Sequence, residues 1–163
     1  MKATQSYDFP SDVELLVYDC DGVLTDNRVL VDEDGKESVF FNRGDGLAIS
    51  KIRGLNIRQL VLSSEINPII EKRCEKLKID VIYGSDNKAD AIRDYCAKAG
   101  ISVKKVMFIG NDLNDLGAME TVGHCGCPND AEREIIAISD WVSSRKGGEG
   151  VIRELYSLIS KKS

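Results

Sequence analysis

Short apolar runs alternate with amphipathic stretches along most of the chain. Four of the apolar runs are typical of buried strands in a parallel sheet, and they lie at 14–19, 57–63, 81–83 and 106–109. A short run near Cys125 and the pair at 141–142 continue the series. The chain is therefore expected to build a sheet whose strands follow one another at regular intervals.

Helices are expected between these strands, because apolar residues recur there every three or four positions. Their ranges are 46–52, 67–77, 88–99, 113–120, 132–138 and 150–159. Two β-rich pieces at 28–31 and 38–41 enclose a turn and predict a hairpin, a flap over about 28–41 after the first strand. The pattern predicts one α/β domain over residues 1–163, with a Rossmann-like parallel sheet and helices on both of its faces.

The composition is that of a globular protein and argues against several classes of function. Of 163 residues, 42% are hydrophobic and 30% are charged, which does not suit a disordered chain. A net charge of −5 without a basic cluster argues against binding to nucleic acid or to an anionic membrane. No apolar run approaches the ~20 residues that span a bilayer. Five scattered cysteines and an N-terminus without the apolar core of a signal peptide predict a reduced, cytoplasmic protein.

The residues that follow each strand are the candidates for chemistry, because ligands of parallel sheets bind outside the carboxyl ends of the strands. Asp19 and Asp21 follow the first strand. Two carboxylates so close repel each other unless a cation lies between them, and oxygen ligands favour Mg²⁺. One carboxylate can then attack an electrophile while the other transfers a proton. The alternative is a pair of surface acids in a turn.

Three further polar groups follow the other strands. Ser63 can donate to a phosphate oxygen or cap the next helix. Lys88 lies near a helix start, where a cation is unfavourable unless an anion shares the site. The segment 110–115, Gly-Asn-Asp-Leu-Asn-Asp, can complete the oxygen shell of the cation or cap a helix. All four groups fall at the same edge of the predicted sheet, which favours one shared site.

This combination resembles the haloacid dehalogenase superfamily of phosphohydrolases. The resemblance is carried by D-x-D-G-V-L-T at 19–25, by Ser63, by Lys88 and by G-N-D-x-N-D at 110–115. It implies that Asp19 attacks phosphorus and forms an aspartyl-phosphate, and that Asp21 acts as acid and then as base. It also implies that Ser63 and Lys88 neutralise the phosphate. Asp115 would hold Lys88, or a metal-bound water, from behind.

The resemblance also implies a Mg²⁺ cofactor. Its ligands would be Asp19, the backbone carbonyl of Asp21, and either Asn111 or Asp112. Many relatives have aspartate where Asn111 stands, and a neutral amide attracts Mg²⁺ less strongly. A weakened or inactive phosphatase is therefore an alternative.

Within this superfamily the chain is similar to the capless branch, because the flap leaves no room for a cap domain. That branch includes 3-deoxy-D-manno-octulosonate 8-phosphate phosphatases, nine-carbon sugar-acid 9-phosphate phosphatases and domains fused to CMP-sialic acid synthetases. The shared segments are 42–46, 71–74 and 147–154. The resemblance implies a homotetramer in which the hairpin packs between subunits and a neighbour helps to close the site.

One position distinguishes the substrates within the branch. Octulosonate phosphatases typically have threonine-glycine-arginine after the second strand, whereas this chain has Ser63-Ser64-Glu65. A glutamate there resembles the nine-carbon group. The substrate contacts that the resemblance implies are Asn42, Arg43, Gly44, Asp45, Gly46, Glu65, Arg73 and Lys76.

The expected function is that of a Mg²⁺-dependent phosphomonoesterase acting on a 2-keto-3-deoxy sugar acid phosphate. The expected substrate is a nine-carbon 9-phosphate, either KDN-9-phosphate or N-acetylneuraminate-9-phosphate. One alternative is the eight-carbon octulosonate 8-phosphate. Two others are a non-catalytic partner of a CMP-sialic acid synthetase and a phospho-acceptor signalling domain. The second carboxylate, Asp21, argues against the signalling domain, which benefits from slow dephosphorylation.

Overall fold

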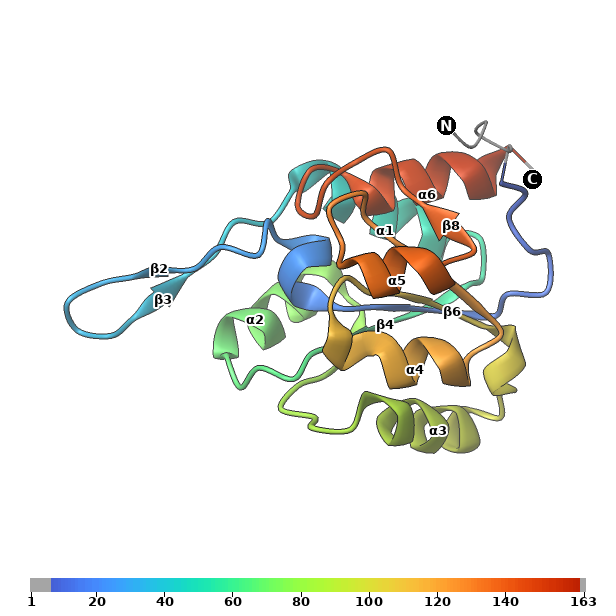
Figure 1. Ribbon diagram of the computed structural model, residues 1–163, viewed down its shortest axis with the longest axis horizontal. Helices are drawn as coiled ribbons and strands as arrows, with labels where there is room; N and C mark the ends of the chain where they lie inside the picture. Colours follow the sequence, from blue (N-terminus) through green and yellow to red (C-terminus); the bar gives the residue numbers. More distant parts are fainter. Residues whose placement is uncertain (1–6, 162–163) are drawn as a thin grey trace.

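The computed structural model describes residues 7–161 and contains a six-stranded sheet with every neighbouring pair parallel (Figure 1). Its strands are β1 (Leu15–Tyr18), β4 (Arg58–Leu62), β5 (Asp80–Ile82), β6 (Val106–Ile109), β7 (His124–Cys127) and β8 (Trp141–Val142). The spatial order is β5-β4-β1-β6-β7-β8. The chain therefore builds outward from β1 to β5, returns to the other side of β1 at β6, and leaves a topological switch point between β1 and β6.

Helices cover both faces of this sheet. One face carries α1 (Arg43–Arg53), α2 (Pro68–Leu77) and α6 (Val151–Ser160), and the other carries α3 (Lys88–Ala99), α4 (Leu116–Thr121) and α5 (Arg133–Ile138). All four residues of β1 are fully buried, because Leu16 and Tyr18 face the first helical layer while Leu15 and Val17 face the second. Within residues 7–161, no helix has the length and apolar character to span a membrane.

Most element boundaries follow the sequence pattern, and the differences have local causes. Helix α1 begins at Arg43 rather than 46, because the Asn42 side chain accepts hydrogen bonds from the amides of Gly44 and Asp45. The expected helix at 113–120 divides into a 3₁₀ turn, η3 (Leu113–Asp115), and α4. Asp112 and Asp115 form a reciprocal capping box around η3, which fixes that tighter turn.

The predicted hairpin projects away from the body of the protein (Figure 1). Its paired strands, β2 (Leu30–Val31) and β3 (Glu37–Ser38), are shorter than the sequence indicated. Thr25 and Phe41 form an isolated bridge at the base of the hairpin. The apolar side chains of the arm are exposed by more than half: Val29, Leu30, Val31 and Phe40. The hairpin is thus anchored at its base, while these four apolar side chains remain largely exposed on this protomer.

Candidate active site

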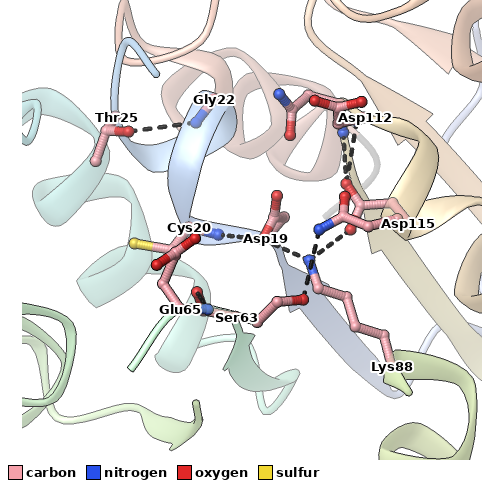
Figure 2. A network of polar contacts seen from close by, with 12 residues as sticks. Asp19, Cys20, Gly22, Thr25, Ser63, Glu65, Lys88, Asp112 and Asp115 are labelled. Carbon is pink, nitrogen blue, oxygen red and sulfur yellow. Dashed lines mark hydrogen bonds and ion pairs between the residues drawn. The ribbon is translucent and has the colours of Figure 1, made fainter. Parts of the chain in front are cut away.

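The switch point brings together one lysine and two carboxylates from distant parts of the chain (Figure 2). Asp19 follows β1, Asp115 closes η3 after β6, and Lys88 is the first residue of α3. The Lys88 ammonium nitrogen lies 2.7 Å from Asp19 Oδ1 and 2.6 Å from Asp115 Oδ1. All three side chains are buried. An ion-pair cluster of this kind, excluded from water, concentrates charge at the carboxyl edge of the sheet.

Burial and mutual charge shift the pKa values within this cluster. Burial disfavours the charged form of Lys88, but the carboxylates of Asp19 and Asp115 outweigh burial and raise the lysine pKa above its ordinary value. Burial and the neighbouring charge of Asp115 raise the pKa of Asp19 to about 7, although Lys88 opposes that rise. A nucleophilic carboxylate must be ionised, and a further cation nearby would favour the charged form of Asp19 at neutral pH.

The turn that follows Asp19 carries the second carboxylate. Residues 20–25, hereafter the 20–25 turn, are closed by a hydrogen bond from the Thr25 amide to the Cys20 carbonyl and by one from the Gly22 amide to Thr25 Oγ1. The half-buried Asp21 lies at the start of this turn. Partial burial, and next the charge of Glu65, raise the pKa of Asp21 above its ordinary value. Asp21 therefore keeps a proton to higher pH than a free aspartic acid, as a proton donor requires.

The oxygen atoms beside this turn fit a magnesium ion. Asn111 Oδ1 faces Asp19 Oδ2 at 3.0 Å and the Asp21 carbonyl at 2.9 Å. With its amide reversed, Asn111 donates hydrogen bonds to both of these oxygens; in the other orientation its oxygen joins them, an arrangement that a bound cation would stabilise. Adjacent ligands of octahedral Mg²⁺, at roughly 2.1 Å each, lie roughly 3.0 Å apart, since 2.1 × √2 is roughly 3.0. The two separations, from Asn111 Oδ1 to Asp19 Oδ2 and to the Asp21 carbonyl oxygen, thus match the spacing of adjacent Mg²⁺ ligands.

The same geometry favours Asn111 over Asp112 as the ligand. The Asp112 carboxylate is exposed and accepts a hydrogen bond from the Leu113 amide at 2.6 Å. Among residues 7–161, no three histidine, cysteine or acidic side chains are grouped as metal ligands; this donor set instead combines one carboxylate with a backbone carbonyl and an amide. Gly22 makes the approach of Asn111 possible. A Cβ on Gly22 would lie 2.0 Å from the Asn111 amide nitrogen.

Asp115 contacts both Lys88 and the backbone of Asn111. One of its oxygens binds Lys88, and the other accepts hydrogen bonds from the backbone amides of Asn111 at 2.9 Å and Asp112 at 3.3 Å. The carboxylate of Asp115 is fully buried. It therefore fixes the lysine and the Asn111 backbone with a single side chain.

Two adjoining cavities open beside Asp21. The smaller, about 160 Å³, is lined by Asp19, Asp21, Asn27, Ser63, Ser64, Glu65, Asn111, Asp112 and Asn114. The larger, about 240 Å³, shares Asp21, Asn27 and Glu65 and extends between the base of the hairpin and the start of α2. Ser63 is buried, and its oxygen accepts a hydrogen bond from the Glu65 amide at 3.1 Å, so its hydroxyl hydrogen remains available for donation. The smaller cavity suits a phosphate group, and the larger suits the part of an ester next to it.

Several predicted substrate residues lie outside these cavities. Arg43, Gly44, Gly46, Arg73 and Lys76 line neither of them. The Arg73 guanidinium lies over the Phe41 ring, 5.3 Å from its centre. Lys76 lines a separate cleft near the end of α2. These residues therefore do not reach the Asp19 site within one protomer.

Two of the predicted substrate residues, Asn42 and Asp45, form hydrogen bonds within the protomer. The Asn42 amide donates to the Gly148 carbonyl at 3.1 Å while its oxygen caps α1. The Asp45 carboxylate is 2% exposed and accepts a hydrogen bond from the Arg153 amide at the start of α6. The prediction of Asp45 as a substrate contact is wrong for this protomer, because its carboxylate is buried at a helix N-terminus.

Other residues line the cavities without having been singled out by the sequence. Asn27, Ser64 and Asn114 line the smaller cavity, and the larger is bounded by Arg28, Val29, Glu37, Val39, Asn67, Ile69 and Ile70. Asn114 lies within the segment 110–115 and Ser64 lies between Ser63 and Glu65, but neither had been given a role of its own. The residues of the hairpin carry no local signal, because only the long-range approach of the hairpin to α2 makes them part of a cavity.

The proteins that this chain is similar to are hydrolases and phosphatases. The sequence matches the haloacid dehalogenase-like hydrolases over residues 56–155. The chain belongs to this family. It is 34% identical over 148 residues to 3-deoxy-D-manno-octulosonate 8-phosphate phosphatase of Salmonella typhi, which covers 90% of this chain and 79% of that protein. The predicted family and enzyme class are thus confirmed, and the chain is a phosphatase of this family.

Solved structures of the same branch confirm the fold. The phosphatase of that name from Moraxella catarrhalis, in complex with magnesium, phosphate and KDO, is 28% identical, has a TM-score of 0.89, and covers 92% of this chain and 87% of that one. The cobalt-bound enzyme from Haemophilus influenzae is 31% identical, has a TM-score of 0.88, and covers 92% of this chain and 88% of that one. Mg²⁺ is the cofactor that the family and the three converging oxygens both indicate.

Proposed function

We propose that the protein hydrolyses the 9-phosphate ester of a nine-carbon 2-keto-3-deoxy sugar acid, such as KDN-9-phosphate or N-acetylneuraminate-9-phosphate. The observation that carries this choice is the position of Glu65, which lines both cavities beside Asp21. The octulosonate phosphatases that the chain resembles typically have arginine there. A glutamate accepts hydrogen bonds from the hydroxyl groups of a polyol chain, whereas an arginine pairs with a carboxylate.

The residues of the site divide the reaction into two steps. Asp19 attacks phosphorus in line, the bond to the ester oxygen breaks, and Asp21 donates its proton to the leaving alkoxide. Asp21 then takes a proton from water, which attacks the aspartyl-phosphate and releases inorganic phosphate with Asp19 restored. Lys88, which contacts Asp19, neutralises the phosphoryl oxygens, and Ser63, which lines the smaller cavity, orients them. When bound, Mg²⁺ lowers the charge repulsion between the phosphoryl group and the carboxylates.

The eight-carbon octulosonate 8-phosphate is the second candidate, and the names of the relatives favour it. A side-by-side assay of phosphate release from the eight- and nine-carbon esters decides between the two. We expect a higher kcat/KM for the nine-carbon ester, and we expect Glu65→Arg to shift the ratio toward the eight-carbon ester. Equal ratios in the two proteins would remove the case for Glu65. Absence of phosphate release from both esters would favour the non-catalytic partner instead.

We also propose a cytoplasmic homotetramer in which the hairpin packs between subunits. The exposed apolar residues of the hairpin support it, because an arm of this kind is costly to leave in water. Arg73 and Lys76 line neither cavity of their own protomer, so they can meet a sugar acid only across such an interface. Light scattering after size exclusion tests the assembly. Replacing Leu30 and Phe40 by serine should give monomers, and a wild-type monomer would refute it.

A further inference from the structure

Two segments that the sequence singled out bind each other rather than the cavities. The first is 42–46 at the start of α1, and the second is 147–154 at the start of α6. Asn42 Nδ2 donates to the Gly148 carbonyl at 3.1 Å, and the Arg153 amide donates to Asp45 at 2.8 Å. The two helices pack along each other on one face of the sheet (Figure 1). The side chains of Asn42 and Asp45 are thus already hydrogen-bonded within the protein.

The second segment also lies directly against the 20–25 turn. The Gly148 amide donates to the Val23 carbonyl at 3.0 Å. A Cβ on Gly147 would lie 2.0 Å from the Gly22 carbonyl oxygen, so no side chain fits between the two backbones. A Cβ on Gly148 would lie 2.5 Å from the Asp26 amide nitrogen. The glycine pair is therefore a backbone support for the turn that carries Asp21.

We propose that Asn42 is a positioning residue for the 20–25 turn. The Asn42 side-chain amide donates to the Gly148 carbonyl, and the Gly148 backbone amide donates to the Val23 carbonyl within the turn. Supported in this way, the turn keeps the Asp21 carbonyl and carboxylate beside Asp19. The turn needs outside support because Gly22, at a φ of +88°, is a glycine, the residue that loses most conformational freedom when it is held in one conformation. This inference goes beyond the proposed substrate and relies on the phosphatase activity only for its kinetic readout.

The two functions of Asn42 can be separated chemically. Its oxygen accepts hydrogen bonds from the amides of Gly44 at 2.7 Å and Asp45 at 3.3 Å and so caps α1, whereas its nitrogen alone reaches Gly148. Aspartate is as good an N-cap as asparagine and is favourable at a helix N-terminus. Asn42→Asp therefore keeps the cap and removes the donor. Asn42→Ser also keeps a capping oxygen, but without placing a negative charge near the Gly148 carbonyl.

The test compares these two variants with wild type and with Ser102→Ala. Ser102 caps the 3₁₀ turn before β6 through the Lys104 amide, at the opposite end of the sheet, and so controls for the loss of a capping contact. Hydrogen exchange of metal-free protein is followed in peptides that cover 20–27 and 146–150. The kcat, KM and half-saturating Mg²⁺ concentration are measured with p-nitrophenyl phosphate, and the Tm reports stability.

We expect Asn42→Asp and Asn42→Ser to exchange about tenfold faster in both peptides. We expect kcat to fall by about 10- to 100-fold, the usual effect of losing a group that orients a metal ligand, with KM within about twofold of wild type. Ser102→Ala should change neither exchange nor kcat. If a variant does not fold, the other decides.

Two outcomes would overturn the inference. Unchanged exchange and kcat in both variants would show that Asn42 only caps α1. A raised KM with unchanged exchange would show that it contacts substrate instead. If wild type releases no phosphate, the proposed function fails, while the exchange rates in metal-free protein still decide whether Asn42 supports the turn.

Discussion

The buried carboxylate of Asp45 makes a sharp prediction about stability and pH. Its Oδ1 accepts a hydrogen bond from the Arg153 amide, but its buried Oδ2 has no hydrogen-bond partner among residues 7–161. Burial raises the pKa of Asp45 from 3.8 to about 6, despite the hydrogen bonds from the α6 backbone. The folded protein therefore binds a proton at this site more tightly than the unfolded chain does.

The sign of the pH dependence follows from that shift. The contribution of Asp45 to stability is fully present below about pH 4 and is lost as the pH rises through about 6. A shift of about two pKa units corresponds to about 3 kcal/mol. Asp45→Asn has nearly the same shape and keeps an acceptor for Arg153, but it cannot ionise. The variant should gain about 3 kcal/mol relative to wild type between pH 4 and pH 7.5.

The assay is urea unfolding of both proteins at pH 4 and pH 7.5, at equal protein concentration. The useful quantity is the difference between the two ΔΔG values. The pH-independent cost of an unpaired amide cancels in this difference, and so do the other titrating groups, Asp19 included. A change in ΔΔG below about 0.5 kcal/mol between the two pH values would refute the assignment of Asp45 as a buried carboxylate that resists ionisation.

Three further predictions concern the catalytic site and its rim. Gly22→Ala should lower kcat by more than about 100-fold, because the new Cβ would lie 2.0 Å from the Asn111 amide nitrogen. A kcat within about tenfold of wild type would contradict this close approach. Asn111→Asp should lower the half-saturating Mg²⁺ concentration about tenfold, whereas Asp112→Asn should change it less than about twofold; the reverse order would make Asp112 the ligand. Asn67→Asp keeps the cap of α2 but loses the 2.9 Å hydrogen bond from the Asn67 amide to Glu37 on the hairpin. The KM for the sugar acid phosphate should therefore rise about tenfold. An unchanged KM in steady-state assays would show that this hydrogen bond does not shape the cavity.

The sequence predicted the sheet well because its central strands are buried on both faces. An apolar run such as 15–18 has no other stable location, and Asn67-Pro68 and Gly100 mark helix ends by local chemistry alone. The residues at the carboxyl ends of β1 and β6 could likewise be brought together by topology. These predictions depend on local preferences or on rules that hold for every parallel sheet.

The roles of individual polar residues could not be predicted in this way. Asn42 and Asp45 have partners more than a hundred residues away, and only the packing of α1 on α6 shows that they bind the protein rather than a substrate. The β-rich pieces of the hairpin were predicted too long, because exposed residues such as Phe40 have no pairing partner within the protomer. Long-range contacts, which the local pattern does not encode, decide these cases.

The central claim is that Asp19 carries the phosphoryl group during turnover. The most direct measurement is mass spectrometry of acid-quenched Asp21→Asn protein after incubation with Mg²⁺ and p-nitrophenyl phosphate, whose leaving phenolate departs without a proton from Asp21. Without the base that activates water, the aspartyl-phosphate should accumulate on Asp19, and an Asp19→Asn/Asp21→Asn protein should carry none. A phosphoryl group on another residue, or phosphate release by Asp19→Asn at the wild-type rate, would contradict the account.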